Sequence, residues 1–374
     1  MKIMQMADIY LPIRQNILYG GTERIISYLD EEFVKKGHES IVAATGDSEV
    51  KGKLIFSINK SIWHVNNKRV RKTIFSPHKR QKHIEKAMEF IKRESIDIVH
   101  DHQVLTHSDR YLSDGKTIST PILVTLHGDN NIISKDRHRT LDDVIKQEDR
   151  KVFFNAISKS QKKEFENTVD VSDIIYHGIP IERYSFSPNL NNCEPYLLNI
   201  GRISREKGQH LAIQISKKTG LPLILAGEIH TPEIDYWKTM IEPFVDGEQI
   251  KFIGPVDDSV KSKLYGGALA FLMPIQWAEP FGLVMIEAMA TGTPVVGFAR
   301  GSLPEIVKNN ETGYVITPSG FEGEDVENMV KAVKNISKIN RCTCRAHVEN
   351  KFTSEIEAQN YIKLYKKILD QIQN

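Results

Sequence analysis

Two carboxylates with seven residues between them, Glu279 and Glu287, flank a phenylalanine–glycine turn and an apolar run in the stretch EPFGLVMIE. A carboxylate pair is typical of glycoside hydrolases, whose two acids lie about 5–9.5 Å apart. On one straight helix this offset would separate the two acids by about 12 Å. The spacing therefore argues against a hydrolytic pair.

The same stretch predicts a helix with one acid on each side of its start. Pro280 suits the first helical turn, and Gly292 ends a helix that runs to about Ala290. Glu279 then lies on the loop before the helix and Glu287 inside it, so the backbone amides of residues 281–284 are unpaired donors suited to a phosphate. These four residues are Phe281, Gly282, Leu283 and Val284.

The two carboxylates beside such a phosphate site would accept hydrogen bonds from hydroxyls. We expect Glu279 to bind a sugar ring and Glu287 a ribose. The alternative for Glu279 is a purely structural one, in which its charge complements the positive end of the helix.

A second cluster of charge lies between two glycines in GRISREKG, residues 201–208. Arg202 and Lys207 follow an apolar run that predicts a strand, and a guanidinium with an ammonium group suits a diphosphate. Arg205, in the same turn, is more typical of a solvated surface charge.

Near the start of the chain, Gly20 and Gly21 precede a helix that is predicted to run to Lys36 and to be ended by Gly37. Two glycines allow a ligand to approach the backbone, and the helix start offers N–H groups to an anion. The dinucleotide pattern G-x-G-x-x-G is absent. A plain turn at the start of a helix explains the glycines equally well.

The elements that must position these residues alternate along the whole chain. Short runs rich in Ile, Leu and Val, separated by amphipathic segments, are typical of buried parallel strands. The predicted strands are Lys2–Met6, Ser40–Ala44, Ile96–His100, Ile122–His127, Val152–Ile157, Ile174–His177, Tyr196–Ile200, Leu223–Ala226, Ile250–Ile253, Leu269–Met273, Pro294–Phe298 and Gly313–Ile316.

The strand pattern occurs twice, which predicts two doubly wound α/β domains that face a central cleft, with ligands at the carboxyl ends of the strands. We place the first domain at residues 1–186, a linker at 187–195 and the second domain at 196–353. Residues 354–374 show helical spacing of apolar side chains, and we expect this helix to cross back and pack on the first domain.

Taken together, the motifs resemble those of the family-4 (group 1) retaining glycosyltransferases, which have the GT-B fold. The resemblance rests on Glu279-x7-Glu287 followed by AMATGTPVV at 288–296, on Gly-Arg-x4-Lys-Gly at 201–208, and on Gly-Gly-x-Glu-Arg at 20–24. It covers nearly the whole chain. The motifs of the second half are highly specific in combination, and those of the first half are looser.

The resemblance implies transfer of a sugar from a nucleotide diphosphate sugar, such as a UDP-sugar, to an acceptor hydroxyl with the anomeric configuration kept. It implies that Arg202, Lys207, the 281–284 amides, Gly20 and Gly21 bind the donor diphosphate, that Glu287 binds the ribose, and that Glu279 binds the transferred sugar. Val256 follows Gly254 where the family binds the nucleotide base. His127, in Leu-His-Gly, is similar to the histidine that contacts the donor sugar, whereas His177 is expected to be structural.

The resemblance also implies that neither a metal nor a cofactor is needed. The leaving phosphate oxygen would then deprotonate the acceptor, and the sequence has no Asp-x-Asp pair at a strand end. The acceptor would be a sugar, a glycolipid or a small molecule. The sequence leaves open the sugar, the base and the acceptor.

Composition excludes several other classes. With 50 Lys and Arg against 48 Asp and Glu, the net charge of +2 does not suggest a nucleic-acid partner. One basic segment, Lys68–Arg93, is either a solvated face or a surface for anionic lipid headgroups or an anionic acceptor. The chain shows no signal peptide and no apolar run long enough to span a membrane, so we expect a cytoplasmic protein, with membrane association possible only at its periphery.

The three cysteines are Cys193, Cys342 and Cys344, which lack the ligand pattern of a zinc site and fit a reducing compartment. We expect all three to face solvent without a chemical role. The rival functions are a nucleotide-sugar epimerase or a phosphorylase on the same scaffold, and a sugar-nucleotide-binding protein without activity. An epimerase would convert its donor without an acceptor, and a glycogen-type phosphorylase would need a pyridoxal lysine for which no signature is present.

Overall fold

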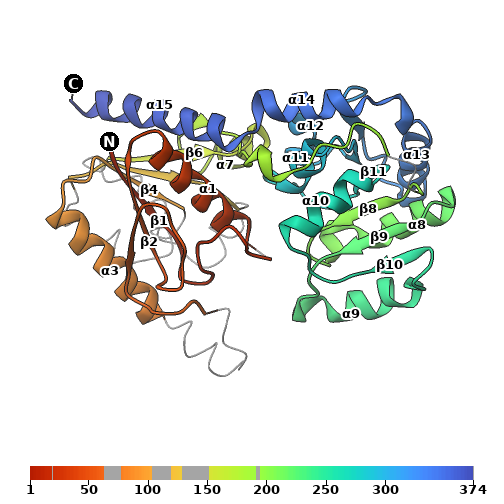
Figure 1. Ribbon diagram of the computed structural model, residues 1–374, viewed down its shortest axis with the longest axis horizontal. Helices are drawn as coiled ribbons and strands as arrows, with labels where there is room; N and C mark the ends of the chain where they lie inside the picture. Colours follow the sequence, from red (N-terminus) through yellow and green to blue (C-terminus); the bar gives the residue numbers. More distant parts are fainter. Residues whose placement is uncertain (19, 63–76, 103–118, 129–150, 191–193, 374) are drawn as a thin grey trace. The chain divides into compact units, whose positions relative to one another are not determined.

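The computed structural model describes residues 1–18, 20–62, 77–102, 119–128, 151–190 and 194–373. They form two compact units, the first made of residues 1–177 with 354–374 and the second of residues 178–353 (Figure 1). Residues 178–186, which the sequence pattern assigned to the first domain, belong to the second unit. The reason is local, because the N–H of Ile179 donates to the carbonyl of Phe352 at 2.9 Å and the N–H of Ser185 donates to the hydroxyl of Ser262 at 3.0 Å.

The first unit contains a seven-stranded parallel sheet in the order β3-β2-β1-β4-β5-β6-β7. Its strands are β1 (Lys2–Met6), β2 (Glu39–Ala44), β3 (Lys53–Phe56), β4 (Ile98–Asp101), β5 (Ile122–Thr125), β6 (Val152–Ala156) and β7 (Val171–Ile174). The strand order reverses between β1 and β4, which places a switch point beside β1.

The sequence pattern failed at the two edges of this sheet. Strand β3 was not predicted. Strand β7 begins three residues before the predicted run Ile174–His177 and overlaps that run only at Ile174. Edge strands have one uncovered side, and here Lys53 and Phe56 of β3 and the middle residues of β7 are exposed. Strand β7, VSDI, therefore lacks the continuous apolar run by which a buried parallel strand is recognised, and in β3, KLIF, the run is only three residues long.

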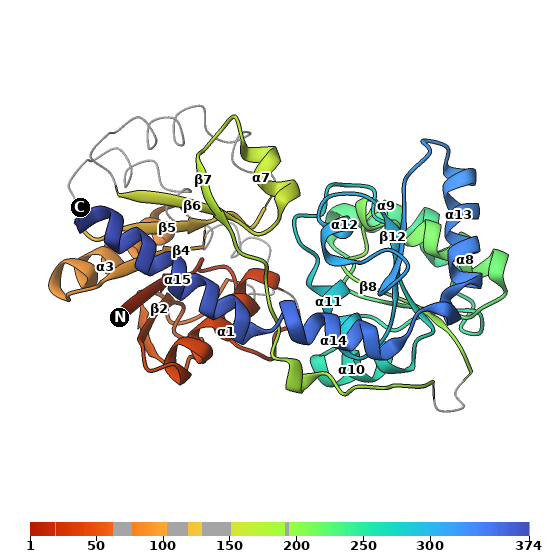
Figure 2. The same cartoon turned by 90° about the horizontal axis from the view of Figure 1, so that it is seen from above.

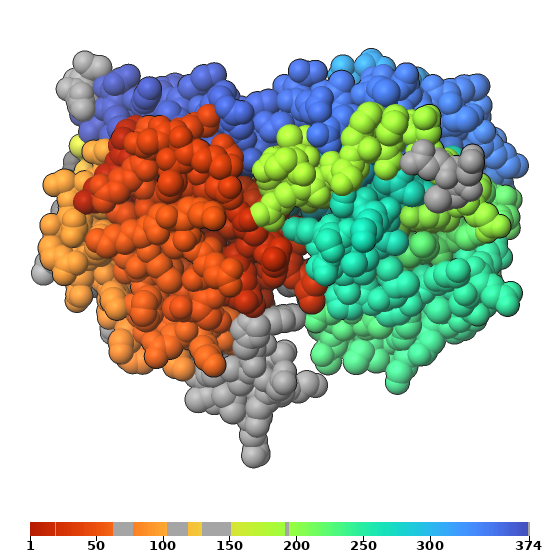
Figure 3. All heavy atoms as spheres, in the orientation of Figure 1, coloured from red at the N-terminus to blue at the C-terminus, as the bar shows by residue number. Residues whose placement is uncertain are grey.

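The helices of the first unit are α1 (Gly21–Lys35), α3 (Pro77–Arg93), α7 (Lys159–Phe165) and α15 (Ser354–Gln373). The last of these confirms the prediction that the C-terminal helix returns to the N-terminal half. Helix α15 packs against α1, and the space-filling view shows the blue C-terminal segment directly against the red N-terminal one (Figure 3).

A layer of polar side chains explains why α15 must pack there. Strands β1, β4, β5 and β6 bury Gln5, His100, Thr125 and Asn155 completely, which leaves polar groups that need partners inside the protein. Three residues of α15 at intervals of four supply partners on one face of the helix. These are Glu357, which contacts His177, Tyr361, which contacts Thr125 and Asn155, and Tyr365, which contacts His100.

The second unit contains a six-stranded parallel sheet in the order β10-β9-β8-β11-β12-β13. Its strands are β8 (Leu197–Ile200), β9 (Leu223–Ala226), β10 (Ile250–Phe252), β11 (Ala270–Met273), β12 (Val295–Phe298) and β13 (Gly313–Ile316). The order reverses between β8 and β11, so the expected ligand position is where these two strands end.

Its helices include α8 (Gln209–Thr219), α10 (Asp258–Gly267), α11 (Leu283–Ala290), α13 (Glu322–Lys334) and α14 (Arg341–Lys351), with the short helices α9 (Ile234–Tyr236) and α12 (Leu303–Ile306). Helix α13 lies beside α8, and α11 packs against both α10 and α14 (Figure 2). Helix α11 starts three residues after Pro280, later than predicted, because Gly282 takes a left-handed conformation with φ 80° and forms its N-cap.

Candidate functional site

Each of three neighbouring strands of the second unit is followed within two residues by a glycine. Gly201, Gly227 and Gly254 follow β8, β9 and β10, and their backbones are joined because Gly201 N–H donates to Ala226 at 3.0 Å and Gly227 N–H donates to Gly254 at 2.9 Å. A side chain on Gly227 would place its Cβ 1.8 Å from the carbonyl oxygen of Gly201. Nothing lies within 4 Å of the position that a Cβ on Gly201 or on Gly254 would take, so the backbone is open at these two strand ends. Val256, half-buried, follows at the outermost of the three strand ends.

The turn after β8 packs directly on the segment after β11. Gly208 has φ 72°, and a Cβ there would lie 2.0 Å from the carbonyl oxygen of Pro274. The N–H of Gln276 donates to the carbonyl of Glu206 at 2.7 Å, which joins the same two segments. These contacts hold Lys207 over the residues that follow β11. Lys207 therefore lies where β8 and β11 end, which is the position expected for a ligand.

Lys207 forms an ion pair with Glu279, and both side chains are largely buried. Trp277 donates its indole N–H to the same carboxylate oxygen at 3.1 Å, while the Lys207 ammonium nitrogen lies 4.8 Å from the centre of the indole ring. The structure thus brings together two of the residues predicted from separate motifs. Trp277 is a third member that the sequence pattern missed, although its position two residues before Glu279 is a usable signal.

Arg202 is held in a similar way by a carboxylate four residues along the chain, Glu206. Both side chains are about one-third exposed, so this pair is partly screened by solvent and easily exchanged for another anion. Both cations at the predicted diphosphate site therefore have carboxylate partners that a bound phosphate would compete with.

The start of α11 differs from that of α8 in its free backbone amides. At α8, the hydroxyl of Tyr236 accepts from the N–H of His210 at 3.1 Å. At α11, by contrast, the amides of Gly282, Leu283 and Val284 donate to no residue within the described part of the chain, and all three residues are partly exposed. The loop before them is fixed because Ser302 donates its hydroxyl to the carbonyl of Phe281 at 2.7 Å. Helix α11 therefore offers the donors that an anion needs.

Glu287 is buried inside α11 and already has two partners from α10. The hydroxyl of Tyr265 donates to its carboxylate at 3.1 Å, and the Lys261 ammonium nitrogen lies 3.5 Å from the same oxygen. The two partners are four residues apart and so share one face of α10. The sequence pattern found the acid but not these partners, whose spacing is the signal that could have revealed them.

In the first unit, Gly20 and Gly21 lie at the start of α1, as predicted. Gly20 is the N-cap with φ 118°, and a Cβ on it would lie 2.5 Å from a carboxylate oxygen of Glu23. Gly21 is exposed. Burial, with the charge of Asp8 nearby, raises the pKa of Glu23 to about 7.

This pKa predicts how stability changes with pH. A carboxyl whose pKa is raised from 4.5 to about 7 on folding binds more protons in the folded state, so its ionisation destabilises the fold as pH rises between those values. We expect Glu23→Gln to stabilise the protein above pH 7 and to change stability little at pH 4. Urea unfolding of both proteins at the two pH values measures this. A stability difference that does not change with pH would contradict it.

His127 lies just beyond β5 in the first unit, at the end of the strand as predicted. Its Nε2 is 2.9 Å from Nδ1 of His102, and its ring stacks on that of His177 with centroids 5.3 Å apart. Burial, followed by the proximity of His177, holds the pKa of His127 well below its usual value, so the ring is neutral at pH 7. His177 in turn contacts Glu357 at 2.8 Å, which supports the structural role expected for it.

The structure corrects the expectation that every cysteine faces solvent. Cys342 is exposed, but Cys344 is buried, with its Sγ 3.5 Å from the carbonyl oxygen of Thr312. The reason is that α14 packs on α11 and carries Cys344 on its inner face. Cys193 lies outside the described residues.

The basic segment Lys68–Arg93 is only partly described, from Pro77 onwards. On α3, Arg80 forms an ion pair with Asp8 at 2.7 Å, and Lys86 donates to the carbonyl of Phe56. Lys82 and Lys92 are exposed. Some of the predicted basic surface is therefore engaged with the protein itself. No helix in the described ranges combines the length and the apolarity needed to cross a bilayer.

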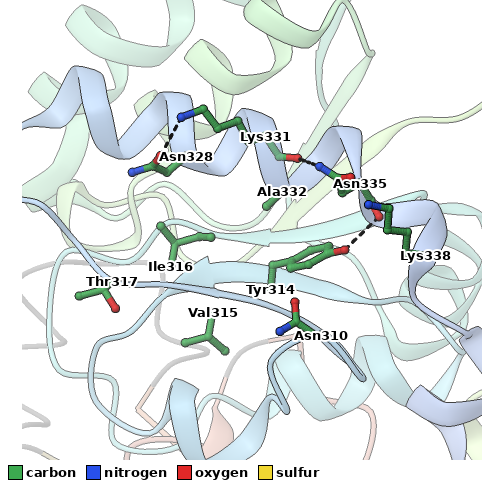
Figure 4. A pocket seen from close by; sticks show the side chains of 10 residues that line it. All are labelled: Asn310, Tyr314, Val315, Ile316, Thr317, Asn328, Lys331, Ala332, Asn335 and Lys338. Atoms are coloured by element: carbon green, nitrogen blue, oxygen red, sulfur yellow. Dashed lines mark hydrogen bonds between the residues drawn. The ribbon is translucent and has the colours of Figure 1, made fainter.

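A shallow hollow also lies along the edge strand β13, away from the residues discussed above (Figure 4). Tyr314 spans its floor and donates its hydroxyl to the carbonyl of Asn335 at 3.1 Å, and Lys331 contacts Asn328 at 3.3 Å. These polar groups are paired with one another, and the hollow contains none of the predicted site residues.

Comparison with known proteins decides the family. The model described as "Glycosyl transferases group 1" matches residues 180–348, and the model described as "Glycosyltransferase Family 4" matches residues 19–183. The chain belongs to the group 1, family-4 glycosyltransferases. The two matches together span the chain from Tyr19 to Val348 and include every site residue predicted from the sequence.

Similar sequences of this glycosyltransferase family include the N-acetyl-alpha-D-glucosaminyl L-malate synthase of Bacillus anthracis, 24% identical over 94% of each chain. The putative glycosyltransferase YtcC of Bacillus subtilis is 25% identical over 57% of this chain, and an uncharacterized glycosyltransferase of Methanocaldococcus jannaschii is 30% identical over 44%. The chain spans 58% and 46% of the lengths of these last two relatives.

Solved structures show the GT-B fold for this chain. A sucrose-phosphate synthase from Thermosynechococcus elongatus superposes with a TM-score of 0.76 at 18% identity and covers 99% of each chain. HepE of Anabaena, solved with UDP and glucose, gives a TM-score of 0.71 at 17% identity over 98% of this chain and 100% of its own. At these identities the likeness establishes the fold.

Proposed function

We propose that the protein is a retaining glycosyltransferase that moves a sugar from a nucleotide diphosphate sugar to an acceptor hydroxyl without a metal ion. The observation that carries the proposal is one edge of the second sheet, where Lys207 and Arg202 lie at the switch point. At the start of α11 beside it, the amides of Gly282, Leu283 and Val284 donate to no acceptor among the residues that the structure describes. UDP is the proposed nucleotide because structurally similar HepE was solved with UDP and with UDP-glucose.

In this proposal the diphosphate exchanges places with the carboxylates that now hold the two cations. Arg202 and Lys207 bind its oxygens together with the amides of Gly282, Leu283 and Val284, and Gly20 and Gly21 are also assigned to the diphosphate. Glu279 and Glu287 bind sugar and ribose hydroxyls, Val256 contacts the base, and His127 contacts the sugar. The acceptor is a sugar, glycolipid or small-molecule hydroxyl.

The chemistry needs no protein nucleophile. The bond between the anomeric carbon and the leaving phosphate oxygen breaks, and the acceptor oxygen bonds to the same face of that carbon. The acceptor proton passes to the leaving phosphate oxygen. Charge develops on the diphosphate during this step, and preorganised cations and helix amides stabilise such charge most strongly where water is excluded.

The same groups predict that activity persists without divalent metal. Because Arg202, Lys207 and the α11 amides supply the positive potential at the leaving group, excess chelator should leave sugar transfer, or slow hydrolysis of the donor, essentially unchanged. A rate assay with and without chelator measures this. Loss of activity that magnesium or manganese restores would show that a metal is required.

Substitution of Glu287 and substitution of Glu279 should have different effects on UDP affinity and on turnover, which tests the roles proposed for these two acids. Glu287→Gln should weaken nucleoside diphosphate by roughly 10- to 100-fold, because a neutral amide replaces a charged acceptor of two ribose hydroxyls. Glu279→Gln should leave that affinity intact or raise it slightly, since Lys207 loses a competing charge, yet turnover should fall because the sugar is no longer held.

Calorimetry with UDP and a turnover assay on both variants make this comparison. Thermal unfolding is the control for stability, because Glu287→Gln leaves the buried Lys261 without its charged partner and could destabilise the fold. Equal loss of UDP affinity in both variants, or full turnover in Glu279→Gln, would show that the roles are not divided in this way.

A further inference from the structure

His127 stands at the end of a hydrogen-bonded chain that starts in the backbone of α1. The side-chain amide of Gln5 donates from Nε2 to the carbonyl of Ile26 at 3.4 Å. The other end of the amide, Oε1, lies 3.3 Å from Nε2 of His102, and Nδ1 of His102 lies 2.9 Å from Nε2 of His127. Gln5 is completely buried and His102 nearly so, so water cannot substitute for either link.

The donor and acceptor of every hydrogen bond in this series follow from the first bond, between Gln5 and the carbonyl of Ile26. A backbone carbonyl only accepts, which orients the Gln5 amide with its oxygen toward His102. His102 must then carry its proton on Nε2 and present a bare Nδ1. A bare Nδ1 requires that His127 donate to it, so the proton of His127 lies on Nε2.

The other ring nitrogen of His127 is therefore an acceptor. Within the described residues no hydrogen bond reaches Nδ1, and the His127 side chain is only partly buried. The ring is held in orientation by its stacking on His177, with an angle of 14° between the two planes. It is neutral, because burial lowers the pKa of both His102 and His127.

We propose that Gln5 and His102 are positioning residues that fix His127 in the Nε2-protonated neutral form, so that its Nδ1 accepts a hydrogen bond from a hydroxyl of the transferred sugar. This rests on the proposed function, in which His127 faces the donor sugar. It adds a rule of specificity, since the sugar must present an O–H group there. A carboxylate at that position, as in a uronic acid, offers only acceptor atoms, so the two lone pairs would repel each other.

Nitrogen-15 NMR of the histidine rings tests the assignment directly, because protonated and bare ring nitrogens differ widely in chemical shift. In the unsubstituted protein near pH 7, His127 should carry its proton on Nε2 and show a bare Nδ1. Gln5→Met removes the acceptor for His102 while keeping a similar shape, so both His102 and His127 should become mixtures of tautomers. A carboxyl buried at this position stays protonated, so in Gln5→Glu one oxygen still accepts from His102 while the O–H donates to the carbonyl of Ile26, and the original form should be retained.

His100 is a built-in control in the same spectra. Its Nε2 lies 2.6 Å from the hydroxyl oxygen of Thr125, and its Nδ1 lies 2.7 Å from the hydroxyl of Tyr365. Thr125 donates its own proton to Asn155 at 2.7 Å, so it accepts from His100. This second network does not include Gln5, and His100 should keep its Nε2 proton in all three proteins.

A kinetic comparison tests the link to the sugar. With whichever of UDP-glucose, UDP-galactose and UDP-N-acetylglucosamine reacts fastest, Gln5→Met should lower turnover by roughly 2- to 12-fold, the size of one neutral hydrogen bond, and Gln5→Glu should lower it less. Affinity for UDP alone, which lacks the sugar, should be the same in all three. UDP-glucuronate should react more slowly than UDP-glucose.

A proton on Nδ1 of His127, a charged ring near pH 7, or an unchanged tautomer in Gln5→Met would overturn the assignment. Equal turnover in the two Gln5 variants, or faster reaction of UDP-glucuronate, would overturn the role toward the sugar. If no nucleotide sugar reacts, the proposed function fails, whereas the spectra still decide whether Gln5 and His102 fix the ring.

Discussion

Lys207→Ala is expected to lower kcat/KM for sugar transfer by about 10²–10³-fold, the loss that follows removal of one preorganised group from the site of developing charge. Lys207 is the cation that the turn after β8 holds against the segment after β11, and in the proposed reaction it exchanges Glu279 for the diphosphate. UDP affinity should fall with it, because the same ammonium group binds the diphosphate before and during the reaction.

Arg205→Ala is the matched control for this variant. Arg205 belongs to the same short turn, but its guanidinium lies 5.3 Å from the ring centre of Tyr236 and forms no ion pair within the described residues. Its removal should change kcat/KM by no more than about threefold, in line with the small energies of exposed charges. Equal losses in the two variants would mean that general positive charge, rather than Lys207, accounts for binding.

Gly208→Ala should destabilise the protein by roughly 2–5 kcal/mol and lower turnover by about 100-fold. Alanine at φ 72° costs about 1–2 kcal/mol, and overpacking against backbone adds about 1–3 kcal/mol. The Cβ would lie 2.0 Å from the Pro274 oxygen, so the turn must move and Lys207 moves with it. A displacement of about 1 Å is enough for a loss of this size.

Gly220→Ala separates the cost of the left-handed backbone conformation from the cost of overpacking. Gly220 also has φ 72°, and it ends the helix that Gly208 begins, but nothing lies within 4 Å of the position its Cβ would take. It should show only the conformational cost, about 1–2 kcal/mol, and normal turnover. Urea unfolding and a rate assay compare the pair. Equal destabilisation, or normal turnover in Gly208→Ala, would show that the close approach to Pro274 does not position the site.

The sequence was sufficient to predict both sheets and the edge at which the site residues gather. Buried parallel strands leave long apolar runs, and residues such as Arg202 that directly follow such runs must lie at the carboxyl edge of the sheet. The ion pair between Lys207 and Glu279, 72 residues apart, is a consequence of that rule. The edge strands β3 and β7 were missed or displaced because the apolar run is only three residues long in β3 and is interrupted by Ser172 and Asp173 in β7.

Partners inside the protein could not be predicted in the same way. Glu287 was assigned to a ribose from the sequence, whereas the structure also gives it Tyr265 and Lys261, whose distance from it depends on how α10 packs against α11. Likewise, the polar layer beneath α15 joins residues more than 200 positions apart, such as Thr125 and Tyr361. No local period encodes such contacts, because they arise from the packing of a C-terminal helix on the first sheet.

The proposed function requires that the protein cleave the bond between a sugar and a nucleoside diphosphate and keep the configuration at the anomeric carbon. Proton NMR of the protein with α-linked UDP-glucose, UDP-galactose or UDP-N-acetylglucosamine, in chelator and without any acceptor, follows this bond directly. We expect slow release of UDP together with the α-anomer of the sugar, detected before it equilibrates in water, and faster release when a suitable acceptor is added. Initial release of the β-anomer, or a nucleotide sugar that is epimerised without release of UDP, would contradict it.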